Sequence, residues 1–215
     1  MTLIIALLAL SLATLYAGKL VPPGALRCVL VPVSSATCRN EGGAGIRELY
    51  LIDTADITGV TFDGTTNELI TAITIDGGAA WAQFQFENDT AFFNQEKQLA
   101  GRTNLNFAQT ISANFPNNDY SIRAALRAAD QCCNLAAIVV DNQGQQRVVG
   151  ILPRYNQAGD AIIGHFSTGL KTGAGSYNTG ADSAADENIR TFTLVANSPK
   201  EACYTSLDVT AISLL

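Results

Sequence analysis

The chain contains one histidine, His165, and catalysis by a nucleophile, a histidine and a carboxylate would have to use it. His165 lies between Gly164 and Phe166 in a segment expected to be a strand, and no nucleophile motif surrounds it. We therefore interpret it as a structural or surface residue. Because no reaction class can be built around this residue, we expect no catalytic residues and a protein that is not an enzyme.

Two pairs of carboxylates have the spacing of oxygen ligands in a turn. Asp53 and Asp56 form one pair, and Asp182 and Asp186 form the other, so each is a candidate Ca²⁺ site. Acidic turns of this kind are more often only solvated, and we expect no metal site. Neither Gly42-Gly43 nor Gly173-Ala174-Gly175 is followed by Lys-Ser or Lys-Thr, which argues against a phosphate-binding loop. No cofactor is expected either.

The five cysteines are Cys28, Cys38, Cys132, Cys133 and Cys203. They include no C-x₂-C pair with a partner histidine, so the spacing does not indicate zinc. An odd number leaves at least one thiol unpaired within the chain. We interpret the cysteines as small buried residues in a reducing cytosol, with a Cys28–Cys38 disulfide as the alternative.

The composition favours a protein that buries surface against other copies of itself. Hydrophobic residues make up 47% of the 215 residues and charged residues only 15%, against roughly 25% in typical soluble domains. Interface cores are depleted in charge, so self-assembly explains this composition, and a monomer covered by Ser, Thr, Asn and Gln is the alternative. The net charge of −6 and the scattered basic residues argue against sequence-specific binding of nucleic acid. An acidic wall that nucleic acid passes without binding is a further interpretation of this charge.

The first sixteen residues, Met1 to Tyr16, are apolar and carry no charge. A leader peptide lacks its positive start here, because the first cation is Lys19, and a membrane anchor needs about 20 apolar residues. A retained arm, helical or extended, is the third interpretation, and all three stay open. The glycine-rich stretch that ends at Gly45 marks the boundary between an N-terminal segment and linker arm, 1–44, and a β-rich assembly domain, 45–215.

Alternation of apolar and polar residues predicts strands along most of the second region. In Asn104–Phe115, for example, alternate residues such as Phe107 and Ile111 point to one face. The run Leu135–Val140 is apolar throughout, which predicts cover on both faces. The expected strands are Ile46–Ile52, Glu68–Ile75 with Leu69, Ile73 and Ile75 on one face, Ala79–Phe86, Asn104–Phe115, Leu135–Val140, Gln145–Leu152, Ala161–Ser167, Ile189–Ala196 and a final strand or two in Tyr204–Leu215.

One helix is expected, over Asp119–Cys132, with Asn117 or Asn118 as its cap. Its apolar residues recur at helical spacing, and Asp119 and Arg123 are placed to form an ion pair. The stripe consists of Ile122, Ala125, Leu126 and Ala129. The predicted fold class is therefore mainly β, an antiparallel barrel or sandwich with one helix packed on it, plus the arm. The segment Gly169–Glu187 is expected to be a long loop.

The order of these segments resembles a family of structural proteins of tailed phages and prophages of Bacteroidetes. The similarity covers residues 43–215 and rests on the series GIRELYLIDTADITGVTFDG, ELITAITIDGG, AQFQFENDTAFFNQ, NLNFAQTISANFP, SIRAALRAADQ and LAAIVVDNQGQQRVVGI. A helix among antiparallel strands is also similar to the tail-tube fold, whose subunits form stacked rings around a conduit. The apolar start departs from that family, in which a short polar start is expected.

The resemblance implies a virion structural protein, preferably a tail-tube subunit, whose partners are copies of itself and other virion proteins. It implies passive contact with passing DNA and no role in the membrane. A secreted or surface-anchored pilus or adhesin subunit is the alternative, and Met1–Tyr16 favours it. The first interpretation places the protein in the virion, assembled in the cytoplasm of a bacterial host, and the alternative places it outside the cell, secreted or at the cell surface.

Overall fold

The computed structural model describes most of the assembly domain and a short piece of the chain before it. The described residues are 33–34, 45–63, 68–87, 90–100, 104–116, 120–132, 134–155, 162–173, 175–178 and 189–208. The leader, anchor and arm interpretations of Met1–Tyr16 concern residues outside this set. Asp119, one partner of the expected ion pair with Arg123, and the carboxylates Asp182 and Asp186 are also outside this set.

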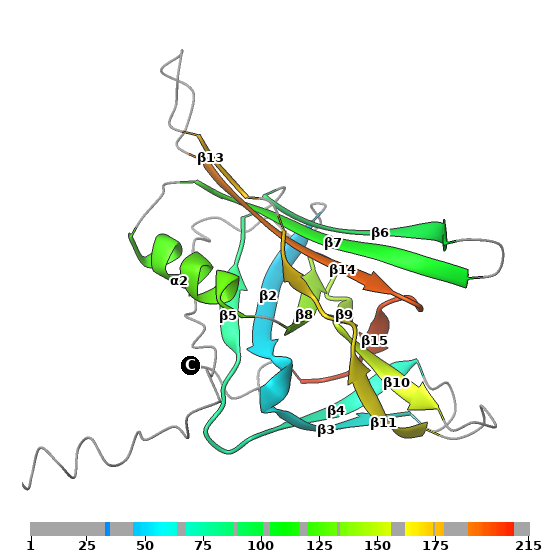
Figure 1. Cartoon of the computed structure of the whole chain (residues 1–215). Helices are drawn as coiled ribbons and strands as arrows, with labels where there is room; N and C mark the ends of the chain where they lie inside the picture. The colour runs from blue at the N-terminus through cyan, green and yellow to red at the C-terminus, as the bar shows by residue number, and fades with distance from the viewer. Residues whose placement is uncertain are drawn as a thin grey trace, which may run out of the picture.

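The centre of the molecule is an eight-stranded sheet that is mostly antiparallel (Figure 1). Two short pairs, β1 with β5 and β15 with β4, are parallel. The strands lie in the order β1 (Val33–Ser34), β5 (Ala82–Gln85), β2 (Ile46–Asp53), β8 (Leu135–Asp141), β9 (Gln146–Val149), β15 (Cys203–Thr205), β4 (Leu69–Ile75) and β3 (Ile57–Phe62). A short 3₁₀ helix, Thr54–Asp56, joins β2 to β3.

A second sheet of five strands packs over one face of the first and forms the upper layer in Figure 1. Three of its strands are long, and all their pairings are antiparallel. Its members are β12 (Lys171–Thr172) and β13 (Ser176–Asn178), which both pair with β14 (Ile189–Ser198), then β7 (Asn104–Pro116) and β6 (Ala91–Ala100). The hairpin of β10 (Ile151–Tyr155) and β11 (Ile162–Ser167) lies beside β3 at the opposite side.

The helix α2 spans Tyr120–Asp130 and is the only α-helix in the described part of the chain. Its buried residues are the apolar stripe that the sequence predicts: Ile122, Ala125, Leu126 and Ala129. They join the core between the two sheets, where Phe84, Phe86 and Phe115 stack with tilted rings. The predicted fold class, a β-sandwich or barrel with one helix, is therefore confirmed.

A second core lies on the other face of the eight-stranded sheet and includes buried residues of β3 and β4. Tyr50, Ile138 and Trp81 belong to it. Because β8 lies between the two cores, all its residues from Leu135 to Val140 are buried, as its continuous apolar run predicts.

The structure corrects the predicted elements at several places. In β4 the register shifts between Thr61 and Phe62 of the partner strand, so Ile70, not Leu69, is the fully buried residue. A bulge of this kind adds one residue to a strand, so the alternation of buried and exposed side chains is reversed beyond it. The predicted strand Gln145–Leu152 is two strands, because Gly150 (φ 94°) turns the chain from one sheet into the β10–β11 hairpin.

Four strands of the assembly domain were not predicted. The expected loop Gly169–Glu187 contains β12 and β13, which are held by backbone pairing with β14. Strands β3 and β6 were also missed. A final strand or two was predicted in Tyr204–Leu215, but the structure shows only β15 (Cys203–Thr205) there: residues 206–208 are not in a strand, and residues 209–215 are outside the described part. Within the described residues, no helix is long and apolar enough to cross a membrane.

Candidate functional site

The open edge of β6 is the first feature that could act on another molecule. β6 ends the five-stranded sheet, and its ten residues pair with β7 without a register shift. The amide of Asn114 donates to the carbonyl of Thr90 at 2.7 Å, which makes that pair a hydrogen-bonded one. Hydrogen-bonded and non-bonded pairs alternate along an antiparallel ladder. The even-numbered residues of β6 therefore bond to β7, and the odd-numbered residues turn their backbone groups outward.

The outward residues of β6 have no backbone partner in the described part of the chain. They are Ala91, Phe93, Gln95, Lys97 and Leu99. Such a row of free amides and carbonyls is a template for pairing with another strand. Two other edges of the described sheets offer a less regular row of backbone groups. At the other edge of the five-stranded sheet, β12 and β13 are short, and at one edge of the eight-stranded sheet, β3 carries two register shifts.

Gln95 and Gln109 hold β6 in place from the inner face of the sheet. The Nε2 of Gln109 donates to Oε1 of Gln95 at 3.2 Å, and the amide of Ala202 donates to the same oxygen at 2.8 Å. Gln109 is only 2% exposed although it is polar. Its burial is explained by these bonds, because a buried amide that finds partners avoids most of the desolvation cost. The edge is thus fixed relative to the core.

A small pocket of about 240 Å³ lies beside the open edge of β6. Phe92 and Phe93 form one wall, and the start of β2 and the β8–β9 hairpin form the other. The wall residues are partly apolar and partly polar: Gly45, Ile46, Phe92, Phe93, Val139, Asp141, Gln145 and Arg147. The pocket therefore offers apolar contact to a side chain that enters from the edge.

Arg147 is held in this pocket between two aromatic rings. Its guanidinium carbon lies 4.9 Å from the ring centre of Tyr204 and 5.9 Å from that of Phe93, and Nη2 donates to the Tyr204 hydroxyl at 3.2 Å. Cations over aromatic rings are attracted by the negative ring face.

Two aromatic side chains near this pocket are exposed: Tyr204 is 49% and Phe92 is 44% exposed. Arginine and aromatic residues are enriched in the energetically dominant positions of protein interfaces.

The outer face of the five-stranded sheet is polar but almost without charge. Glu96 and Lys171 are the charged residues on this face in the described strands. Its other side chains are mainly amides and hydroxyls: Asn94, Asn106, Thr110, Ser112, Asn114, Thr191, Thr193 and Asn197.

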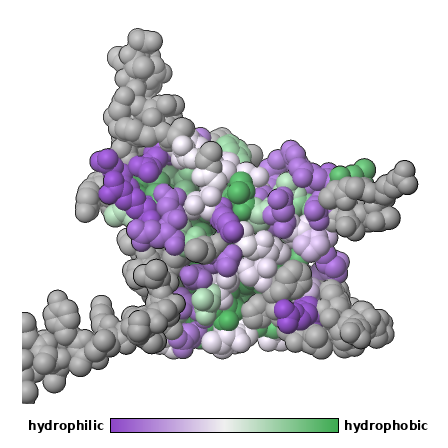
Figure 2. Space-filling model, in the orientation of Figure 1, coloured by the Kyte–Doolittle hydropathy of each residue, from purple (hydrophilic) through white to green (hydrophobic). Residues whose placement is uncertain are grey.

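On the side of the molecule seen in Figure 2, hydrophobic residues occur in small patches between hydrophilic and neutral ones. That side therefore offers no broad apolar surface to a partner.

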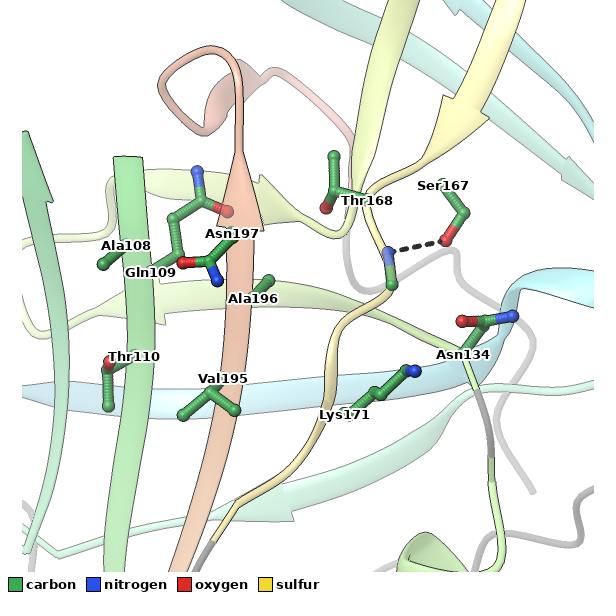
Figure 3. A pocket seen from close by; sticks show the side chains of 11 residues that line it. Ala108, Gln109, Thr110, Asn134, Ser167, Thr168, Lys171, Val195, Ala196 and Asn197 are labelled. Atoms are coloured by element: carbon green, nitrogen blue, oxygen red, sulfur yellow. Dashed lines mark hydrogen bonds between the residues drawn. The ribbon is translucent and has the colours of Figure 1, made fainter. Parts of the chain in front are cut away.

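A larger hollow of about 620 Å³ opens where β12 separates from β14 (Figure 3). The chain turns away at Gly169 (φ 74°), whose amide donates to the Ser167 hydroxyl at 3.1 Å. Lys171 and Asn134 lie on one side of the hollow, and Val195 and Asn197 lie on the other. Its lining holds one ionisable residue, Lys171, and no acid, so the lining residues supply no general acid–base pair.

A buried polar cluster lies on β2 and β5. The hydroxyl of Tyr50 donates to Oε2 of Glu48 at 2.6 Å and accepts from Nε2 of Gln83 at 3.1 Å. Arg47 Nε lies 3.5 Å from Oε1 of Glu48. Burial, and then the bond to Glu48, raises the pKa of Tyr50 above its ordinary value. The phenol therefore stays protonated as the donor to Glu48, and these two bonds give Tyr50, Glu48 and Gln83 polar partners inside the fold.

Among the candidate catalytic and metal residues, the structure describes the backbone of His165 and the pair Asp53 and Asp56. His165 pairs with Pro153 across the β10–β11 hairpin, and its side chain lies outside the described set. Asp53 accepts from the amide of Ala55 at 2.9 Å and so caps the 3₁₀ helix, whereas Asp56 is buried. Within the described residues, no group of three or more His, Cys, Asp and Glu side chains could hold a metal ion.

The cysteines differ from the expectation of reduced thiols. Cys132, two residues after the end of α2, is buried and disulfide-bonded. Cys203, on β15, is a free and buried thiol, as expected for a small core residue. Burial, and then the charge of Glu68, raises the pKa of the Cys203 thiol to about 11. The expectation that all cysteines are reduced is therefore wrong for Cys132. The alternative Cys28–Cys38 pair concerns residues outside the described part.

Sequence reasoning missed the open edge because it missed β6. The signal available was the pair Phe92-Phe93 followed by a run of polar residues, which lacks the alternation typical of strands. No protein-family model matches the chain, and no curated protein is significantly similar to it.

Proposed function

We propose that the chain is a non-enzymatic structural subunit that assembles with copies of itself, preferably as a tail-tube subunit in the virion of a tailed phage. The observation that supports this proposal most is the open edge of β6. A long, regular edge strand with unpaired backbone groups is a liability for a monomer, and pairing with another chain removes it. A head-to-tail contact of this kind closes into a ring or continues as a filament.

The low charge of the chain supports the same proposal. With charged residues at only 15%, part of the surface is best accounted for as buried contact between subunits. The outer face of the five-stranded sheet, with amides and hydroxyls and few charges, suits the wall of a conduit. Nucleic acid would pass such a wall without strong binding, because binding depends on basic residues that neutralise phosphates.

The second candidate is a secreted or surface-anchored β-rich subunit of the pilus or adhesin kind. The disulfide at Cys132 favours it, because stable disulfides are typical of oxidising compartments and rare in the cytosol. The uncharged segment Met1–Tyr16 is compatible with export as well as with an arm. Both candidates are assembling structural proteins, and neither needs a cofactor.

Electron microscopy of the purified full chain tests the proposal, and the intact mass of the same sample separates the two candidates. A tail-tube subunit should form rings or tubes and retain Met1–Tyr16. A secreted subunit should lack that segment and contain the disulfide. A protein that stays monomeric at every concentration tested contradicts both candidates.

A further inference from the structure

We propose that the open edge of β6 and the pocket beside it receive the apolar N-terminal segment of a second copy, which adds a strand to the five-stranded sheet. This inference rests on the proposed self-assembly and names the segment that makes the contact. The chemistry is that of strand addition, in which backbone hydrogen bonds give affinity and side-chain pockets give specificity.

The edge supplies the backbone part of the site. The outward amides and carbonyls of Phe93, Gln95 and Lys97 follow one another at every second residue, so an incoming strand can form a regular antiparallel or parallel ladder. The bonds from Gln95 to Gln109 and Ala202 fix this part of β6, so pairing does not require the sheet to move.

The pocket supplies the side-chain part of the site. A strand along β6 turns every second side chain to one face, and the pocket between Phe93 and Val139 has room for an aliphatic one. Phe92 and Tyr204, both nearly half exposed, flank the same place and would be covered by the incoming chain. Arg147 stays held between its two aromatic partners and keeps the pocket wall in place.

The segment Met1–Tyr16 fits this site by its chemistry and its reach. It is rich in leucine, isoleucine and alanine and has no charge, so it places no like charge opposite Glu96 or Lys97. Residues 1–32 precede β1, and an extended chain of that length spans roughly 100 Å at about 3.3 Å per residue. That is ample to reach a neighbouring subunit. A segment this apolar is also a liability unless another surface covers it.

A photocrosslinking experiment on the assembled full chain tests the inference. A benzophenone amino acid replaces Phe92 in one preparation and Val195 in another, because both side chains are exposed and lie on the same sheet. Val195 does not line the pocket beside β6. Mixing labelled and unlabelled chains before irradiation shows whether a crosslink joins two copies. Peptide mapping then identifies the captured segment.

The expected result is a crosslink from position 92 to residues 1–16 of another copy, at least ten-fold stronger than from position 195. Normal assembly with crosslinks that map elsewhere, or only within one chain, overturns this inference and leaves the proposed function standing. Assembly by a chain whose intact mass lacks Met1–Tyr16 does the same. Absence of both assembly and crosslinks overturns the inference together with the proposed function.

Discussion

A Cβ atom at Gly150 would lie 2.6 Å from the carbonyl oxygen of Leu135, which is closer than such atoms approach in folded proteins. Gly150 also has φ 94°, a backbone conformation that residues with side chains rarely adopt. At this residue the chain leaves β9 and enters β10, so the close approach fixes the corner between the central sheet and the β10–β11 hairpin.

Replacing Gly150 with alanine should therefore destabilise the fold. Backbone strain alone should lower the free energy of unfolding by about 1–3 kcal/mol, and the contact with Leu135 adds to it. Gly77→Ala is the matched control, because nothing lies within 4 Å of a Cβ there, and it should change stability by less than about 0.5 kcal/mol. Urea denaturation measures both. Equal midpoints for the two variants would show that the corner is not constrained.

The helix α2 should depend on its apolar stripe. Leu126 is 2% exposed and belongs to the core between the sheets. Leu126→Ala should lower the free energy of unfolding by about 2–5 kcal/mol, because it removes buried volume and leaves a cavity. Leu99→Ala changes an 80% exposed leucine and should have little effect. A wild-type denaturation midpoint for Leu126→Ala would contradict the packing of α2 described above.

The strength of the local pattern determined which elements were predictable from sequence. The helix stripe at Ile122 and Leu126, the alternation in β7 and the apolar run of β8 each have one dominant period, and these elements were found. β6 was not, because Asn94 to Gln98 are polar residues with weak strand propensity that pair with β7 through the backbone.

Other misses arose from contacts between distant residues. The shift that buries Ile70 instead of Leu69 depends on how β3 and β4 pair, and local alternation does not report it. The split at Gly150 depends on the approach of Leu135. The polar hollow around Lys171 forms where two strands separate, which no motif marks. An open edge is likewise a property of the whole sheet.

Cys203 should make stability depend on alkaline pH. Its pKa is raised from 9.0 to about 11 in the folded chain, so the folded state holds its proton more tightly. The stabilisation is complete below about pH 9 and is lost as the pH rises through about 11. Unfolding monitored between pH 8 and 11 should show a smaller decline in Cys203→Ala than in the wild type. Identical slopes would exclude this thiol as a source of the decline.

The disulfide at Cys132 should make stability depend on reducing agent. A native disulfide typically stabilises by about 2–4 kcal/mol, largely by restricting the unfolded chain. Dithiothreitol should therefore lower the denaturation midpoint of the wild type and of Cys203→Ser, but not that of Cys132→Ser. Sensitivity that persists in Cys132→Ser would place the responsible disulfide elsewhere.

The open edge can be blocked with one substitution that spares the β6–β7 ladder. Lys97→Pro removes an outward amide, and proline is tolerated at such a position of an edge strand. Gln98→Pro removes an amide that bonds to β7 and should destabilise the fold. Lys97→Ala removes the same charge as Lys97→Pro but keeps the amide, so it separates the effect of the charge from that of the edge.

Sedimentation velocity of the full chain and these variants tests the role of β6 in assembly most directly. The wild type and Lys97→Ala should sediment as large assemblies, while Lys97→Pro should stay folded, with a denaturation midpoint close to that of the wild type, and sediment as a monomer. Assemblies of unchanged size formed by a folded Lys97→Pro chain would contradict assembly through the edge of β6.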